Sequence, residues 1–502
     1  MKNIYMKLLK SAAVIAVAFS MTSCLEKLPG DYILEEEGMK SLSDAEQTLT
    51  GIYTAYMSSA LYSGYLTLCP DIQADFVYAV QGNTNQFGTH WLWDIRSTNS
   101  EVESVYAALY RVIGRCNFYL DQVDELRNSL TDDAEIQYLD YYTGEVYCAR
   151  ALAYSELIKC FCKAYDPASA ENDLGIVLAD SYFGKKPSSR ASLKDSYDFV
   201  LRDLAKAEEL LDEENDYYSA VYFTKAAAHA IHARVALYMQ DWDAAIEQSS
   251  VLIDRTDVFA LATTDKYSAN QSYLDYMWTN DTSFEVIWKI GFTQTSYGGA
   301  LGQVFLNFNN DFTYYYPDYV PAQWVLDLYA SNDMRYKAYF ASGQTGYPHQ
   351  LTWPLLVKYF GNENLMQYQI YHVSMPKPLR LAEQYLIRAE AYCRKGQYAA
   401  ASADIAKLNS ARSVGNVSAN LNADNWLKTI SDERVKELYM EGFRLHDLKR
   451  WNMGFDRKPQ TSTQAEGSSM KISADNPLFV WPIPKNELEA PGAEIQPNES
   501  NR

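Results

Sequence analysis

The feature that most constrains the fold is a series of paired segments with apolar residues three and four positions apart. This spacing gathers apolar side chains on one face of a helix, so each segment predicts an amphipathic helix. The helices expected on this basis cover residues 43–60, 101–128, 134–164, 192–212, 223–240, 242–255, 379–395, 397–412 and 424–441. Helices therefore dominate the expected fold, and many of them come in pairs along the chain.

Small residues mark the surfaces where two pairs of helices would touch. Residues 226–238 read AAAHAIHARVALY and, after a tight turn, residues 242–246 read WDAAI. Residues 382–413 repeat this composition around Gly396. Small side chains let two helices approach closely, which is typical of tetratricopeptide-like hairpins. With two looser pairs, the sequence predicts four such units, within residues 101–164, 192–255 and 379–451.

Between the helices lie long stretches without helical periodicity. They are rich in Asn, Gly, Tyr, Trp and Pro, which favours loops with minor β-hairpins. Long loops in a compact body usually carry function. We expect a mainly α fold class with a large irregular portion, and a single body over residues 24–502. The loop-rich portion is expected at residues 61–100, 256–378 and 452–502, with a further loop at 165–190.

The first residues have the pattern of a bacterial secretory leader. Three lysines accompany an apolar run at residues 11–21 that is shorter than the roughly 20 residues needed to cross a bilayer. Thr22 and Ser23 precede Cys24, as in a lipobox, although a methionine stands where leucine is usual. We therefore expect residues 1–23 to be a lipoprotein signal peptide and Cys24 to carry acyl chains. A cleaved peptide without lipidation is the alternative.

The charge of the chain argues against nucleic acid as a partner. The formal net charge is −20 at pH 7, and loss of the leader's lysines would make the remainder more negative. A polyanion would be repelled by such a surface. We attribute the acidity to solubility at a cell exterior.

No motif for catalysis, a cofactor or a metal stands out. The chain lacks a Gly-rich phosphate loop, a G-x-S-x-G elbow and an H-E-x-x-H motif. A glycosidase needs two carboxylates across a sugar, and sequence order cannot pair them among 64 acidic residues. His229 and His232 lie on one helical face and could share a metal, but their alanine-rich setting favours packing. Buried thiols are expected, with a disulfide involving Cys69 left open, at Cys69, Cys116, Cys148, Cys160, Cys162 and Cys393.

Motifs spread along the chain resemble the SusD/RagB family. The most specific is RLAEQYLIRAEA at residues 380–391, followed by LNSAR at 408–412. DLKRW at 447–451 and WPIP at 481–484 continue the likeness, and SCLE at 23–26 begins it. The shared order of these motifs, rather than any one of them, carries the resemblance. It covers nearly the whole chain beyond the leader.

The resemblance implies a function in nutrient uptake. A SusD/RagB protein is expected to be a lipid-anchored, surface-exposed protein of the outer membrane. It would capture an oligosaccharide or polysaccharide and deliver it to a SusC-like TonB-dependent transporter, without catalysis or a cofactor. The helical repeats would contact the transporter, and the loops would face the ligand. Two alternatives stay open, a RagB-like component that binds peptides or proteins and a surface glycoside hydrolase.

Charged residues of the family motifs predict architecture. Arg434, Glu437, Glu441 and Arg444 recur at spacings of three and four, so they can pair along one helical face or bridge to a neighbouring helix. Glycan-binding residues are expected in the loops instead. Trp91 and Trp93 would project to one side of an extended segment and form a platform amid polar residues. Packing of the loop rings onto the helical body is the alternative. The candidates are Asp75, Asn83, Trp91, Trp93, Asn99, Tyr297, Tyr314 and Tyr315.

Overall fold

The computed structural model describes residues 38–184, 187–212, 218–308, 313–347, 351–415, 417–460 and 467–501. The chain divides into two units, Met1–Lys40 and Ser41–Arg502, and every described helix and strand belongs to the second. The predicted leader, residues 1–23, and Cys24 lie outside the described residues. Across the ranges given above, no helix combines the length and the apolar character needed to span a bilayer.

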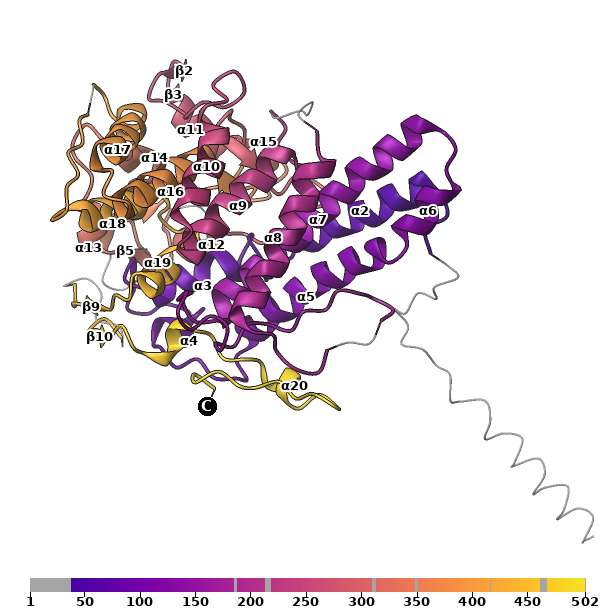
Figure 1. The fold of residues 1–502 in the computed structure, drawn as a ribbon. Coiled ribbons are helices and arrows are strands. Elements are labelled where there is room, and N and C mark those ends of the chain that lie inside the picture. Colours follow the sequence, from indigo (N-terminus) through magenta and orange to yellow (C-terminus); the bar gives the residue numbers. More distant parts are fainter. Residues whose placement is uncertain are drawn as a thin grey trace, which may run out of the picture. The chain divides into compact units, whose positions relative to one another are not determined.

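Helices dominate the second unit, as the sequence predicts, and the predicted mainly α fold class is confirmed (Figure 1). The larger helices form what we call the helical body. They are α2 Leu42–Tyr56, α5 Ser100–Leu120, α6 Val123–Ser129, α7 Asp133–Phe161, α8 Leu193–Leu210, α9 Lys225–Met239, α10 Trp242–Ile253, α16 Leu381–Arg394, α17 Tyr398–Arg412, α18 Trp426–Glu437 and α19 Arg444–Arg450.

Side-chain caps fix where many of these helices begin. A polar side chain before the first turn accepts a hydrogen bond from a backbone N–H that has no partner within the helix. Five consecutive long helices begin this way, at Asn99 for α5, Asp132 for α7, Ser192 for α8, Thr224 for α9 and Asp241 for α10. The local sequence therefore contributes directly to where these helices start.

Several predicted helices differ in extent from the observed ones. The helix expected at 101–128 is broken into α5 and α6, and at the break the Asp121 carboxylate accepts hydrogen bonds from the N–H groups of Tyr182 and Phe183. The helix expected at 424–441 ends at Glu437, and Met440 beyond it has a φ of 58°. A positive φ is incompatible with continuing a right-handed helix. The first two residues of the segment expected at 379–395 form a strand instead.

Neighbouring helices pack against one another in chain order. Helix α7 contacts both α5 and α8, and α10 contacts both α9 and α16. In Figure 1, α2, α5 and α7 run side by side. Buried alanines at positions 233, 236, 245 and 391 lie where α9, α10 and α16 meet. Small side chains at these contacts match the predicted hairpins, and the interpretation as four tetratricopeptide-like repeats stays a prediction.

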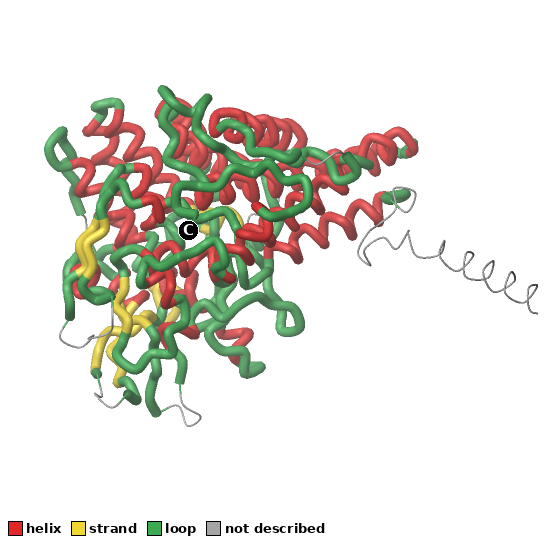
Figure 2. The backbone as a smooth tube through the Cα atoms, turned by 90° about the horizontal axis from the view of Figure 1, so that it is seen from below, coloured by secondary structure: helices red, strands yellow, loops and turns green. Residues whose placement is uncertain are grey.

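Within the described ranges the strands form five antiparallel pairs, and most lie among the loops at one side of Figure 2. The pairs join segments far apart in sequence or close a hairpin. They are β1 Val77–Ala79 with β5 Tyr319–Pro321, β2 Lys266–Ser268 with β3 Gln271–Ser272, β4 Val286–Trp288 with β8 Leu379–Arg380, β6 Phe340–Gln344 with β7 Thr352–Leu356, and β9 Phe455–Arg457 with β10 Met470–Ile472.

The loop-rich portion also contains short helices that the sequence does not predict. Most have fewer than two turns, so no clear periodicity marks them. They are α3 Tyr65–Gln73, α4 Gly88–Trp91, α11 Tyr273–Thr279, α12 Gln303–Leu306, α13 Gln323–Leu326, α14 Arg335–Tyr339, α15 Glu363–Met366, the 3₁₀ helix η2 Pro477–Phe479 and α20 Lys485–Leu488.

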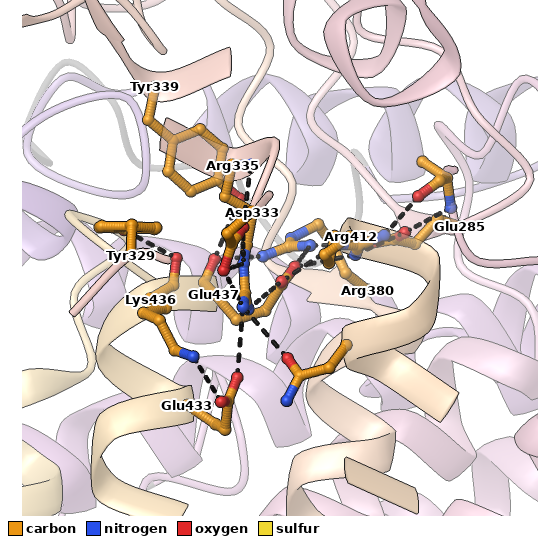
Figure 3. A network of polar contacts seen from close by, with 12 residues as sticks. Glu285, Tyr329, Asp333, Arg335, Tyr339, Arg380, Arg412, Glu433, Lys436 and Glu437 are labelled. Carbon is orange, nitrogen blue, oxygen red and sulfur yellow. Dashed lines mark hydrogen bonds and ion pairs between the residues drawn. The ribbon is translucent and has the colours of Figure 1, made fainter. Parts of the chain in front are cut away.

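A buried ion network fastens the loop-rich portion to the helical body (Figure 3). At its centre, Glu437 of α18 binds Arg335, Arg380 and Arg412 at 2.9–3.2 Å. Arg380 and Arg412 also bind Glu285, which comes from the long segment before α16. All five side chains are almost fully buried. Of the two roles predicted for Glu437, bridging between elements is the one observed.

Candidate ligand-binding site

The pairing of β1 with β5 joins two loop regions that the sequence assigns to one site. Residues 77–79 pair with residues 319–321 in antiparallel register. The loop that leaves β1 therefore lies beside the loop that enters β5. Residues 344–347 join them, because the N–H of Gly346 donates to the carbonyl of Tyr315 at 2.9 Å. We call residues 80–87, 313–318 and 344–347 the β1–β5 loop cluster.

Asp318 ties the first two segments of the cluster together. Its carboxylate accepts hydrogen bonds from the backbone N–H and the hydroxyl of Thr84 at 2.5 and 2.9 Å. Its carbonyl accepts a bond from the N–H of Val80 at 2.9 Å. Only 4% of Asp318 is exposed, and burial raises the pKa of its carboxyl group. This buried anchor gives both loops a defined position.

Three consecutive tyrosines line the cluster, and all are half-buried. Tyr316 lies against Gly346, where any added Cβ would come within 2.3 Å of the Tyr316 ring. Its ring also meets the buried Tyr347 ring edge-on, with centroids 5.4 Å apart. The backbone N–H of Tyr315 donates to the carbonyl of Gln344 at 3.3 Å. The predicted Tyr314 and Tyr315 therefore directly precede a residue, Tyr316, whose ring is closely packed.

Amide side chains occupy the loop that leaves β1. Asn83 is half-buried and shapes this loop, because its amide donates to the carbonyl of Val80 at 2.7 Å and accepts from the N–H of Asn85 at 2.6 Å. Gln81, Asn85 and Gln86 are exposed. The cluster thus offers partly exposed rings beside amides, which can donate and accept hydrogen bonds.

The prediction of an exposed tryptophan platform is wrong. Residues 88–91 are helical rather than extended, and only 2% of Trp91 and 8% of Trp93 is exposed. The Trp91 ring lies under the guanidinium of Arg457, 3.6 Å from the ring centroid. The indole N–H of Trp93 donates to the carbonyl of Gln73 at 2.6 Å, and its ring packs on Phe479. Both rings belong to the core that attaches the loop.

Two other predicted residues have structural contacts. Asp75 forms a bidentate ion pair with Arg444 at 2.8 and 3.0 Å. Asn99 caps α5, accepting from the N–H of Val102 at 2.9 Å and donating to Thr89 at 3.0 Å. The side-chain polar atoms of Asp75 and Asn99, predicted to bind a sugar, therefore already have protein partners.

Tyr297 lies on another loop of the same portion. Its side chain is 46% exposed. The following residues, Gly298 and Gly299, approach Ser63 so closely that an added Cβ would clash with it. The loop that carries Tyr297 is therefore seated just beyond the end of α2, and its ring is open to a ligand.

The histidines considered as metal ligands serve helix packing. His232 lies 2.9 Å from Glu208 of α8, and His229 lies 2.6 Å from Gln248 of α10. In the parts of the chain that the structure describes, no three His, Cys, Asp or Glu side chains are arranged to hold a metal ion. The six described cysteines are free and buried.

A groove of about 430 Å³ lies along α5, and sequence reasoning missed it. Its walls come from α5, residues 177–182 with 187–188, and residues 487–495, so no local motif marks it. Tyr106, Tyr110 and Tyr182 line it. The Tyr110 hydroxyl and the Asn117 amide already donate hydrogen bonds to carbonyls of the groove wall. None of the predicted glycan-binding residues lines this groove.

Two family models match most of the chain between them. One, described as starch-binding and associating with the outer membrane, matches residues 31–237. The other, for the SusD family, matches residues 267–498. The chain belongs to the SusD/RagB family. The family's motif residues are thus largely architectural here, since Arg380, Arg412 and Glu437 form the buried ion network.

Relatives and solved structures agree with this SusD/RagB membership. The chain is 22% identical to the SusD-like protein P2 of Formosa agariphila, over 88% of this chain and 90% of the relative. It is 24% identical to the SusD-like protein P25 of the same organism, over 59% of this chain and only 55% of the relative. A SusD superfamily structure from Bacteroides thetaiotaomicron superposes with a TM-score of 0.77 at 22% identity, covering 91% and 99% of the two chains. A putative sugar binding protein from Bacteroides vulgatus gives 0.74 at 24% identity, covering 92% and 99%.

Proposed function

We propose that this SusD/RagB protein captures a glycan at the cell surface and delivers it to a SusC-like TonB-dependent transporter. The observation that carries the proposal is the β1–β5 pairing, which sets tyrosine-bearing and amide-bearing loops side by side. A sugar ring has an apolar face of C–H groups and a polar rim. Aromatic rings can stack on that face while amides bond the rim.

The way the cluster is held supports binding rather than catalysis. Asp318, the carboxylate at its centre, is buried and occupied by Thr84, so it lacks a free oxygen facing a ligand's glycosidic bond. The Tyr316 ring is held by Tyr347, and a ring fixed by packing loses little freedom when a ligand binds, which favours affinity. We therefore propose a binding protein that leaves its ligand intact.

Names of similar proteins support a carbohydrate as the ligand. One matching family model is described as starch-binding, and one similar structure is that of a putative sugar binding protein. The proposed anchor is Cys24, where acyl chains would hold the protein on the outer membrane. Capture would then be followed by handover, with the protein acting as a hinged lid over the transporter.

Calorimetric titration of the purified protein tests the glycan site. We expect a glycan selected by array screening to bind, and the double change Tyr314→Ala and Tyr315→Ala to weaken binding about 30-fold, or about 2 kcal/mol, the usual cost of losing a well-packed contact ring. Tyr138→Ala is the matched control, because this ring is 60% exposed on α7. Equal affinities for the double variant and the control would contradict the site.

Two further outcomes would replace the proposed function. Release of reducing sugar in proportion to the amount of protein would indicate a glycoside hydrolase. Binding of peptides, with no glycan on the array retained, would indicate a RagB-like peptide-uptake component. Co-purification with a TonB-dependent transporter from detergent extracts tests the delivery step.

A further inference from the structure

Five aromatic rings form an exposed row, four from residues 267–284 of the loop-rich portion and one, Tyr218, from the segment before α9. Four of them are 47–52% exposed, and the fifth, Tyr276, is half-buried. Exposed apolar patches are uncommon on soluble proteins and usually mark an interaction surface. We call these rings the aromatic row, which consists of Tyr218, Tyr267, Tyr273, Tyr276 and Phe284.

Neighbouring rings of the row contact one another. The ring centroids of Tyr267 and Tyr276 lie 3.9 Å apart, and those of Tyr267 and Tyr273 lie 5.7 Å apart. The rings of Tyr218 and Phe284 lie 5.2 Å apart. Tyr276 interacts electrostatically with both Tyr267 and Tyr218, so it lies between the two pairs of rings. Hydrogen bonding to Tyr267 and burial raise the pKa of Tyr276 to about 12.

The apolar spacing of helix α11 places its tyrosines on the outer face. Leu274, Met277 and Trp278 are buried, while Tyr273 and Tyr276, three positions apart, share the outer face. A capping box fixes the start of the helix, since the hydroxyl of residue 272 and the carboxylate of residue 275 bond each other's backbone N–H. The β2–β3 hairpin, directly before this cap, carries Tyr267.

Two buried acids hold Phe284 outward. Asp281 is fully buried and accepts bonds from the side chains of Lys377 and Asn362 at 2.5 and 2.7 Å. Glu285 is fully buried and pairs with two arginines of the network in Figure 3. The loop between α11 and β4 is therefore pinned on both sides of Phe284. The anchored backbone presents the Phe284 ring at the surface, where it contacts Tyr218.

We infer that the aromatic row is a second glycan-contact surface, which binds a neutral polysaccharide along its length. This inference rests on the proposed function and adds to it a site and a ligand class. Four of the five rings are tyrosines, whose hydroxyls can bond sugar hydroxyls while the ring faces stack. The exposed neighbours Ser268 and Asn270 offer further uncharged hydrogen-bonding groups. A row of several rings matches a chain of sugars better than a single one.

Charge and chemistry separate this ligand from other partners. A net charge of −20 disfavours an acidic polysaccharide, since like charges repel. A membrane-binding surface combines apolar side chains with several basic ones. The hairpin of the row carries one basic residue, Lys266, which follows the acidic Asp265. Docking of a protein is the remaining alternative, and the experiment below distinguishes it.

Affinity electrophoresis tests the inference with soluble starch, galactomannan and arabinoxylan as neutral probes and polygalacturonate as the acidic one. The row variant carries Tyr273→Ala and Phe284→Ala. In the neutral gel that retards the wild type most, we expect its dissociation constant to rise at least tenfold. Tyr273→Phe, which keeps the ring, and Tyr138→Ala, which removes an exposed ring elsewhere, should stay within twofold of the wild type. Thermal melting of all variants should coincide, because the changed rings face outward.

The possible outcomes assign failure to one proposal or the other. If the row variant is retarded as much as the wild type, the aromatic row is not a glycan-contact surface, and the proposed function is unaffected. The same result combined with loss of a co-purifying membrane protein makes the row a protein-docking surface. A wild type that no polysaccharide retards and no array glycan binds overturns the proposed function, and the row with it. Preferential retardation by polygalacturonate overturns the neutral ligand class.

Discussion

Trp91 and Phe284 are both aromatic residues in the loop-rich portion, yet 2% of the first and 52% of the second is exposed. The difference comes from their surroundings. Arg457 lies on the Trp91 ring and bonds the backbone beneath it, and burial lowers the pKa of this arginine to about 9. Phe284 sits between two buried acids that face inward. Whether a loop ring is buried or exposed thus depends on how the residues around it are anchored.

Trp91→Ala should act on stability rather than on glycan affinity. Emptying a packed aromatic site costs roughly 3–5 kcal/mol of unfolding free energy. Urea denaturation should show this loss, and calorimetry should give an unchanged affinity per folded molecule. A fall in affinity without a fall in stability would return Trp91 to the glycan site.

Glu145 makes stability depend on pH. Only 2% of this residue is exposed, its one hydrogen-bonded partner in the described residues is the Tyr53 hydroxyl, and burial raises its pKa from 4.5 to about 8. The folded state therefore holds a proton that the unfolded state loses as pH rises above about 4.5. The contribution of Glu145 to stability falls with rising pH until about 8, where the folded state also ionises.

Glu145→Gln should remove this dependence, because a neutral amide keeps a hydrogen-bonding group without a titratable proton. We expect the variant to gain thermal stability over the wild type, and the gain to increase between pH 5 and pH 8. Differential scanning calorimetry across this range provides the measurement. Glu247→Gln, at an exposed position of α10, should give no such trend. A constant difference at all pH values would mean that Glu145 is already ionised when folded.

At the scale of elements, arginines replace apolar packing where the loops meet the helical body. Arg335 of α14 is fully buried and pairs with Asp333, Glu433 and Glu437 at 2.7–3.3 Å. Although burial raises the pKa of Glu437, Arg412 and Arg380 hold it well below its usual value. Figure 3 shows these side chains converging from α14, α17, α18 and the strand before α16. Long loops without an apolar stripe are positioned this way.

Arg335→Ala should therefore loosen the segment before α16. Removing one partner of a buried ion pair costs about 3–5 kcal/mol, because the remaining carboxylates lose their compensation. Lys428→Ala is the control, since this lysine is 78% exposed in its pair with Asp432 and such pairs contribute less than about 1 kcal/mol. Chemical denaturation gives both values, and hydrogen exchange should locate the loosening in α14. Equal costs for the two variants would contradict a role for the network in fastening the loops.

At the scale of the whole molecule, the proposed capture and delivery would require the protein to stay at the membrane. No described helix could hold it there by spanning the bilayer. The proposed anchor is the acylated Cys24, where each buried methylene adds about 0.8 kcal/mol. The binding surfaces proposed above belong to the other unit, residues 41–502.

Cys24→Ala should release the protein from the membrane. The variant is expected in the soluble fraction of cells, without incorporation of labelled fatty acid, while glycan affinity stays unchanged. Fractionation and metabolic labelling provide the measurement, with Cys393→Ala as the control, because this buried thiol lies in α16. A Cys24→Ala variant that remains in washed outer membranes would contradict lipid anchoring.

The sequence by itself determined the helical body. Apolar spacing predicts the long helices, the capping residues lie beside their starts, and alanines lie where α9, α10 and α16 meet. These features are local, so a linear sequence contains them. The order of motifs likewise indicated the family, because motif order needs no knowledge of contacts.

Only the tertiary structure decided which loop residues are available to a ligand. Tyr297 is exposed and Trp91 is buried, although both are aromatic residues in segments rich in turn formers. The aromatic row escaped prediction because Tyr218 and Phe284 lie far apart in sequence and meet only after folding. Burial of a ring depends on contacts such as that of Arg457 with Trp91, which link residues hundreds of positions apart. Periodicity along the chain carries no information about contacts of this kind.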